Sequence, residues 1–184
     1  MPPKPAAGSR LDPLIFVIRP HAGVAAKIEA QCAALKAQHG LGRPFIGADR
    51  LHITLQYLPW ERAAVHSFLP YAEEIVAQVP RAPFEVLLTE ALSFQIGRRE
   101  YPLVLSGENP AIKALCGGLG AAMRRLELGQ SVKRSVTPHM TLLYDPKLVP
   151  AQPIEPIGWR ATELVLIHSV QGSSRHDVLA RWPL

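Results

Sequence analysis

The chain has 184 residues, of which 48% are apolar and 19% are charged. This length suits one globular domain, or two small lobes that share a core, and the composition excludes a disordered chain. The formal charge of +5 is weaker than the excess of most dedicated duplex-binding proteins, but it is compatible with a phosphate-bearing substrate.

The first half of the chain is predicted to contain two strands and two helices. Residues 1–12 are rich in proline, lack the apolar region of a signal peptide and are expected to form a flexible tail. Apolar runs predict strands, good helix formers predict helices, and glycine or proline marks their ends. The elements are a strand over 14–18, a helix over 22–38 stopped by Gly40, a strand over 51–58 ended by Pro59, and a helical segment over 61–79 that Pro70 breaks, kinks or restarts.

The second half adds further strands and a third helix. Asn109 is a plausible cap for that helix, with Pro110 at its first position. Strands interleaved with three helices indicate an α+β or an α/β fold. The elements are strands over 84–92 and 102–106 joined by a turn at 97–100, a helix over 110–126, a strand over 140–144, a proline-rich connection over 146–156, and strands over 162–170 and 177–182.

The two cysteines favour a reducing compartment. Cys32 and Cys116 each lie in an apolar helical pattern, which predicts buried, reduced thiols and a cytoplasmic protein, with a disulfide as the alternative. No apolar run approaches the roughly 18 residues that a membrane helix needs, so no membrane association is expected.

One ten-residue stretch of the first half has a counterpart in the second. Residues 50–59 read RLHITLQYLP, residues 137–146 read TPHMTLLYDP, and the two agree at five of ten positions without a gap. Unrelated windows of this length share about one position at ordinary residue frequencies. The agreement includes both polar residues of each copy, which are His52 and Thr54 in the first and His139 and Thr141 in the second, where the histidine lies 87 residues after its counterpart.

Each copy is predicted to present an imidazole and a hydroxyl on one face of a strand, because side chains two residues apart share a face. Two copies related by an approximate twofold axis would face one another across a groove. Attack on a phosphodiester needs one proton removed from the nucleophile and another delivered to the departing oxygen, and a histidine pair does both near neutral pH. The threonine hydroxyls can donate hydrogen bonds to the phosphate oxygens.

Three other kinds of site have weaker signals. His168, Ser169 and Asp177 invite a hydrolase triad, but there is no G-x-S-x-G turn and adjacent residues of a strand face opposite ways. A metal site is not expected, because His52 and His139 lack acidic or cysteine companions at ligand spacing. Three glycines at 117, 118 and 120 lie inside a helical pattern and are interpreted as a packing contact and not as a phosphate loop.

At its two His-x-Thr motifs the sequence resembles the two-histidine phosphoesterase superfamily, and most closely the bacterial RNA 2′,3′-cyclic phosphodiesterases, also called 2′-5′ RNA ligases. The motifs are His52-Ile53-Thr54-Leu55 and His139-Met140-Thr141-Leu142. The resemblance implies an α+β fold in which residues 13–184 form a single bilobed domain, with two pseudo-symmetric lobes whose antiparallel sheets are flanked by helices around a central cleft. It also implies that no metal and no cofactor is used.

The resemblance implies that a 2′,3′-cyclic phosphate end of RNA is opened to a 2′-phosphate, with reversible 2′-5′ ligation as a related activity. By the same analogy His52 is the acid that protonates the departing 3′ oxygen and His139 is the base that activates water. A non-catalytic module that binds RNA ends or nucleotides on the same fold is the alternative. Both intact His-Thr pairs favour the enzyme, because a binding module has no need for two groups that transfer protons.

The residues that hold the substrate are less sharply indicated. Many relatives carry a basic residue two positions after the second Thr-Leu, where this chain has Tyr144 followed by Asp145. Lys133 or Arg134 is therefore expected to supply the charge that faces the phosphate. Tyr57, Tyr144 and Phe94 are candidates for stacking on a base. The expected substrates are RNA ends or cyclic nucleotides, and the protein is expected to be a monomer.

Overall fold

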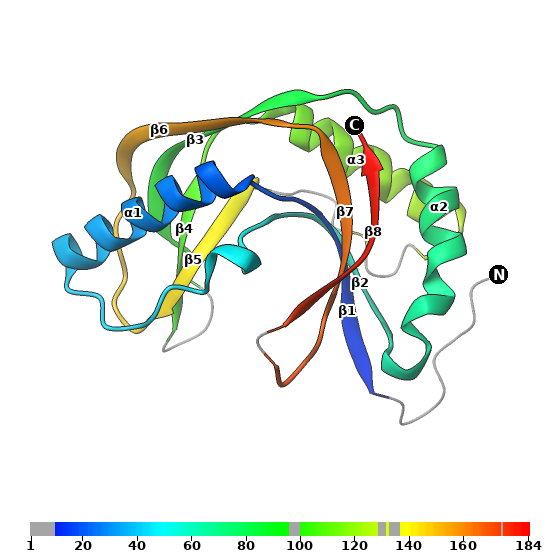
Figure 1. Cartoon of the computed structure of the whole chain (residues 1–184), viewed down its shortest axis with the longest axis horizontal. Helices are drawn as coiled ribbons and strands as arrows, with labels where there is room; N and C mark the ends of the chain where they lie inside the picture. The colour runs from blue at the N-terminus through cyan, green and yellow to red at the C-terminus, as the bar shows by residue number, and fades with distance from the viewer. Residues whose placement is uncertain (1–9, 96–99, 129–131, 133–136, 174) are drawn as a thin grey trace.

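The computed structural model describes residues 10–95, 100–128, 132, 137–173 and 175–184. Within these residues the strands form one antiparallel sheet with the order β6-β3-β4-β5-β2-β1-β7-β8 (Figure 1). The strands are β1 Leu11–Ile18, β2 Ile53–Glu61, β3 Phe84–Ser93, β4 Tyr101–Ser106, β5 His139–Asp145, β6 Gln152–Ala161, β7 Glu163–Ser169 and β8 His176–Pro183. The helices are α1 Ala22–His39, α2 Leu69–Ala77 and α3 Pro110–Arg125, with 3-10 turns η1 Ala48–Arg50 and η2 Arg62–Phe68.

The sheet has two halves of four strands that follow the same plan. In one half β2 pairs with β1, which pairs with β7; in the other β5 pairs with β4, which pairs with β3. The halves meet where Ile53 of β2 lies opposite Met140 of β5. The predicted α+β fold with two pseudo-symmetric antiparallel lobes is confirmed, and the two four-stranded halves are joined at their motif strands into one sheet.

The helices cover one face of this sheet and leave the other face to the motifs. Leu14, Phe16 and Ile18 of β1 point into the main core beneath the helices, whereas Val17 packs on the opposite face in a small separate cluster with Val165. Two of the three helices cross to the other half of the sheet: α1 follows β1 but packs on β6, and α3 follows β4 but packs on β2 (Figure 1). The remaining helix α2 follows β2 and packs beside α3.

Close packing of α3 explains the glycine run. A Cβ atom on Gly120 would lie 2.9 Å from the Gln56 side chain of β2, and one on Gly118 would lie 3.0 Å from Val79. The interpretation as a packing contact is confirmed for Gly118 and Gly120, whereas a Cβ atom on Gly117 would meet no atom within 4 Å. Both cysteines are free, buried thiols, as predicted. Among the described helices, none is both long and apolar enough to cross a membrane.

Several predicted boundaries differ from the structure. The strand over 51–58 continues through Pro59 to Glu61, because Pro59 lies in a part of β2 that pairs with β1 but has diverged from β5, so its missing N–H breaks no ladder bond. The prediction of a connection over 146–156 was wrong in its second part, because strand β6 begins at Gln152. The prolines of β6 are tolerated because this strand lies at the edge of the sheet.

Other differences lie at the helix ends. The helical segment over 61–79 divides into η2 and α2, and Pro70 restarts it in the first turn of α2. Asn109 precedes α3 but does not cap it with its side chain; its amide instead bonds the backbone N–H and carbonyl of Leu87. β1 begins at Leu11, inside the stretch predicted as a tail, and the turn predicted at 97–100 lies outside the described residues except for Glu100.

Candidate functional site

The two motifs lie side by side at the junction of the two halves of the sheet. The pair Ile53 and Met140 is fully buried in the main core. Extending this antiparallel register by one residue in each direction places His52 opposite Thr141 and Thr54 opposite His139. These four side chains are half-buried and lie on the face away from the main core. The structure therefore brings together the four residues that the sequence selected, around a pseudo-twofold axis between Ile53 and Met140.

The same β-bulge follows the threonine in both motifs. The register of β2 against β1 skips Leu55, and the register of β5 against β4 skips Leu142. The carbonyl of each bulged residue has a partner elsewhere: the Cys116 thiol donates to Leu55 O at 2.8 Å, and the Ile46 N–H donates to Leu142 O at 2.9 Å. Bulges re-aim side chains beside functional sites, and here the device is repeated in each half.

Both imidazoles are held in the same orientation by the backbone. The Nδ1 atom of His52 lies 2.7 Å from the carbonyl oxygen of Arg50, and the Nδ1 atom of His139 lies 2.7 Å from that of Thr137. A carbonyl can only accept, so Nδ1 carries the hydrogen in both rings and Nε2 is the unprotonated nitrogen of the neutral form. Each histidine is thus fixed in the tautomer that lets Nε2 take up or release a proton.

The surroundings of His52 are positively charged. Burial lowers the pKa of His52 to about 4, and the nearby His176, Arg19 and Arg50 add to this effect, against a hydrogen bond to the Arg50 carbonyl. The His176 ring stands edge-on to the His52 ring with centroids 5.3 Å apart. The Nε atom of Arg50 is buried without a hydrogen-bond partner among the described residues. Arg19, Arg50 and His176 outnumber the nearby carboxylate of Asp49, which acts on Arg19 and His176. Such an excess of basic groups around a neutral imidazole is typical of a site that receives an anion.

The surroundings of His139 are different. Phe94 stands edge-on to its ring with centroids 4.8 Å apart, which places this predicted stacking residue against the catalytic candidate itself. Ser106 of β4 lies opposite His139, and its hydroxyl donates to the Pro138 carbonyl at 3.0 Å. In the part of the chain that the structure places, no group of three or more His, Cys, Asp and Glu side chains could hold a metal ion.

The remaining predicted substrate residues are not gathered at the motifs. Tyr57 and Tyr144 each lie five residues beyond their histidine, on stretches of β2 and β5 that have separated, and they are 38% and 51% exposed. Tyr57 lies opposite Ile15, which packs against the small cluster on the motif face. Lys133 and Arg134 lie outside the described residues.

The acidic residue Asp145, which lies close to the position where many relatives carry a basic residue, has a structural explanation. This buried carboxylate accepts backbone N–H bonds from Gly42, Arg43 and Lys147 at 2.9–3.0 Å. Burial alone would raise the pKa of Asp145, but these hydrogen bonds outweigh it and hold the pKa below its usual value. Asp145 therefore fixes the loop that leads into the first motif to the end of the strand that carries the second.

Sequence reasoning missed three residues beside His52. Arg50 could have been found from its place two residues before the histidine, and Arg19 from its place at the end of a strand that pairs with β2. His176 had no such signal, because it reaches His52 only through the path of the β7–β8 hairpin in space. His168, which the triad alternative considered, bonds the buried Asp12 at 2.7 Å and not a serine.

We expect His176→Phe to move the limb of the kcat/KM profile that reports His52 to higher pH. Phenylalanine keeps the ring packed against His52 but removes the positive charge that His176 can carry, so the pKa of His52 rises. The measurement is the pH dependence of hydrolysis of a cyclic nucleotide between pH 3.5 and 8, with His66→Phe on the exposed η2 turn as the matched control. A limb unchanged from wild type would contradict this coupling.

Comparisons with known proteins give consistent matches. A family model described as the 2'-5' RNA ligase superfamily matches residues 17–172. No curated protein matches the chain. A crystal structure described as a phosphoesterase is 26% identical, with a TM-score of 0.70, and the match covers 95% of this chain and 99% of that chain.

Two named structures share the fold at lower identity. LigT of E. coli, complexed with 3'-AMP, is 22% identical with a TM-score of 0.67 over 96% of this chain and 99% of that chain. TT0787 of Thermus thermophilus is 22% identical with a TM-score of 0.70 over 94% of this chain and 97% of that chain.

Proposed function

Because the chain belongs to the 2'-5' RNA ligase superfamily, we propose that it is an RNA 2′,3′-cyclic phosphodiesterase, which opens a cyclic phosphate end to a 2′-phosphate by metal-independent acid/base catalysis. The observation that supports this most strongly is the matched pair of imidazoles, each fixed through Nδ1 to the carbonyl two residues earlier. A module that only binds nucleotides has no use for two rings held in the same proton-exchanging tautomer.

The proposed reaction is an in-line displacement at phosphorus. Nε2 of His139 accepts a proton from water while the water oxygen forms a bond to phosphorus. The bond between phosphorus and the 3′ oxygen breaks on the opposite side, and Nε2 of His52 delivers a proton to that oxygen. The products are a 2′-phosphate and a free 3′-hydroxyl. A 5′-hydroxyl of a second strand in place of water would give a 2′-5′ linkage, and the reverse reaction exchanges the two roles.

The charges around His52 fit the role of acid only when substrate is present. Without substrate the lowered pKa keeps His52 neutral at pH 7. A bound phosphate anion opposes the repulsion from the nearby arginines, so the proton is taken up together with the substrate. The Thr54 and Thr141 hydroxyls donate to the non-bridging oxygens, and Lys133 or Arg134 supplies further charge on the second side. Phe94, Tyr57 and Tyr144 are proposed to contact the nucleoside.

E. coli LigT is described in complexes with 3'-AMP, NADP+, ATP and phosphate, which supports a substrate that carries a nucleotide or a phosphate. The two free, buried thiols support a reducing compartment, and we propose that the protein acts in the cytoplasm. Burial raises the pKa of Cys32 to about 11, so this thiol stays protonated and is a structural residue.

The test is hydrolysis of 2′,3′-cyclic AMP and of RNA ending in a cyclic phosphate, with excess EDTA throughout. We expect full turnover in EDTA and a 2′-phosphate product, because the two histidines supply both proton transfers. The position of the phosphate is read by chromatography against 2′-AMP and 3′-AMP. Binding of both substrates without turnover would instead favour a non-catalytic module, and a 3′-phosphate product would contradict the proposed leaving group.

A further inference from the structure

The pseudo-twofold axis relates two pockets, one beyond each histidine. Ile18 lies opposite Ile53 in one half, and Leu105 lies opposite Met140 in the other. The next residues along β1 and β4, Arg19 and Ser106, are therefore equivalent. Arg19 lines a pocket that we name the His52-side pocket, and Ser106 lines one that we name the His139-side pocket.

Each pocket also holds an equivalent glutamate from the third strand of its half. Glu90 of β3 lies opposite Ser106. Extending the register of β1 against β7 beyond the pair of Val17 and Val165 places Glu163 opposite Arg19. Both glutamates line their pockets, so the two hollows are equivalent positions of the repeated plan.

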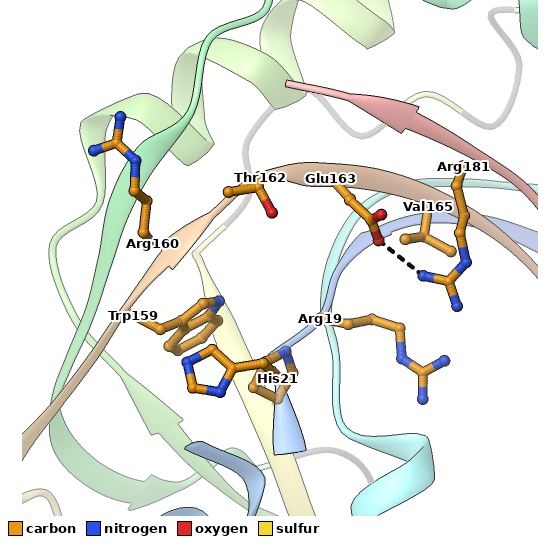
Figure 2. A pocket seen from close by; sticks show the side chains of 9 residues that line it. Arg19, His21, Trp159, Arg160, Thr162, Glu163, Val165 and Arg181 are labelled. Atoms are coloured by element: carbon orange, nitrogen blue, oxygen red, sulfur yellow. Dashed lines mark hydrogen bonds and ion pairs between the residues drawn. The ribbon is translucent and has the colours of Figure 1, made fainter. Parts of the chain in front are cut away.

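The charge of the two pockets is opposite. The His52-side pocket adds Arg181 and Arg160 to Arg19, against the carboxylate of Glu163. Arg160 points away from the other two arginines (Figure 2) and is paired with Glu85 at 3.3 Å, so Arg19 and Arg181 supply the positive charge of the pocket. The lining that the structure describes for the His139-side pocket instead has Glu90 and Glu108 against the one ammonium of Lys113, which is paired with Glu108 at 2.8 Å. The two pockets occupy equivalent positions but differ in charge, which indicates that, among the described residues, the His52 side is the one suited to an anion.

The groups of the His52-side pocket leave donors for such an anion. Figure 2 shows the guanidinium groups of Arg19 and Arg181 on the same side of the pocket, with Glu163 bonded to Arg181 at 2.9 Å. Burial and the charge of Arg181 both lower the pKa of Arg19, against the charge of Asp49, so the two guanidinium groups lie close together. Arg19 also donates a hydrogen bond to the carbonyl oxygen of Asp49. The indole Nε1 of Trp159, a residue only 4% exposed, is buried without a partner among the described residues.

The size of the pocket fits a small anionic group. Its volume is about 260 Å³, below the ~300–1,000 Å³ of pockets that enclose a drug-sized ligand. Arg19 is shared with the surroundings of His52, since its charge acts on the pKa of that histidine. The pocket is thus a continuation of the candidate active site and not a separate one.

We propose that the His52-side pocket binds the phosphodiester that joins the terminal nucleotide to the one before it, so that the preferred substrate is an oligoribonucleotide and not a cyclic mononucleotide. This inference rests on the proposed function. In an in-line displacement C3′ of the ribose lies on the side of the departing oxygen, opposite the water, and the 5′-linked phosphodiester follows from the neighbouring C4′, while O2′ keeps the sugar bonded to phosphorus. A cationic subsite beside His52 therefore places the RNA on the same side as the acid, and leaves the water side without a phosphate subsite among the described residues.

The test compares 2′,3′-cyclic AMP with the dinucleotide ApA that ends in a 2′,3′-cyclic phosphate. The variant is the double substitution Arg181→Gln with Glu163→Gln, which removes the ion pair as a unit and leaves no unpaired carboxylate. We expect kcat/KM for the dinucleotide to fall about tenfold, as for the loss of one hydrogen bond to a charged group, and that for cyclic AMP to stay within about twofold. The control is Arg125→Gln, an exposed residue at the end of α3, on the side of the sheet that the helices cover.

A second measurement keeps the inference testable without turnover. Fluorescence anisotropy of labelled ApA ending in a 2′-phosphate should show weaker binding to the double variant than to wild type, with a shallower dependence on salt. Equal loss of kcat/KM on both substrates, or equal binding by variant and wild type, would overturn the subsite alone. Absence of turnover on both substrates by the wild type would overturn the proposed function, and with it this inference.

Discussion

His52→Ala and His139→Ala should each lower kcat for cyclic-phosphate hydrolysis by about 10²–10⁴-fold while the protein stays folded. Each substitution removes one of the two proton transfers, and a positioned general acid or base contributes about that much. Both side chains are half-buried on the face away from the main core, and Ile53 and Met140 beside them stay packed within it. The measurement is single-turnover hydrolysis at pH 6 to 7, with circular dichroism and thermal melting to check the fold.

Three further variants make this prediction specific. His66→Ala, on the exposed η2 turn, is the matched control and should leave kcat unchanged. The double variant His52→Ala with His139→Ala should lose less than the product of the two single losses, because groups that act in one transition state are not additive. His139→Gln should be as slow as His139→Ala, since an amide keeps a hydrogen bond but cannot exchange the proton. Turnover within tenfold of wild type in both single variants would contradict the two-histidine mechanism.

The central part of this site could be predicted because its geometry follows from local rules. Alternation along a strand places His52 with Thr54 and His139 with Thr141, whatever the rest of the fold, and the internal match showed that the two stretches belong together. The joining of the stretches at Ile53 and Met140 needed the structure, because register depends on contacts between distant strands. The bulges at Leu55 and Leu142 are likewise decided by pairing with β1 and β4.

The features that the sequence could not predict depend on contacts between distant residues, or lie in a strand that contains proline. Pro153 and Pro156 argued against a strand, yet both fit β6 because it lies at an edge of the sheet. In the sequence, Asp145 stood out only because it lies where many relatives carry a basic residue nearby. Its structural role depends on hydrogen bonds that its carboxylate accepts from a loop about a hundred residues earlier. The charge difference between the two pockets was visible in the sequence only after the register showed which residues are equivalent.

Asp12→Ala should lower the free energy of unfolding by about 3 kcal/mol at pH 7, because it leaves two basic partners without their buried carboxylate. Asp12 is only 1% exposed. Arg62 and His168 each donate to it at 2.7 Å, and the Gln171 N–H donates at 3.3 Å. Urea denaturation followed by fluorescence measures the loss. Glu85→Ala, which breaks the exposed ion pair with Arg160, is the control and should change stability by less than about 0.5 kcal/mol.

The pH dependence of this loss has a defined sign. Burial alone would raise the pKa of Asp12, but the hydrogen bonds from Arg62 and His168 outweigh it and lower the pKa. A carboxyl group with a lowered pKa contributes stability above its unfolded pKa of about 3.9, and that contribution is lost as the pH falls through the folded value. The difference in stability between wild type and Asp12→Ala should therefore shrink as the pH falls below about 4. A difference that does not shrink in this range would contradict the ionised pair.

The same network connects stability to the candidate active site. Asp12 joins β1 to His168 near the end of β7, and the hairpin that follows carries His176 to the ring of His52. Loosening the hairpin should expose His52 to water and reverse part of the burial that lowers its pKa. Asp12→Ala should therefore move the limb of kcat/KM that reports His52 in the same direction as His176→Phe does, at a pH where the variant is still folded. Combining the two substitutions should shift the limb by less than the sum of the single shifts, because both act through the contact between His176 and His52.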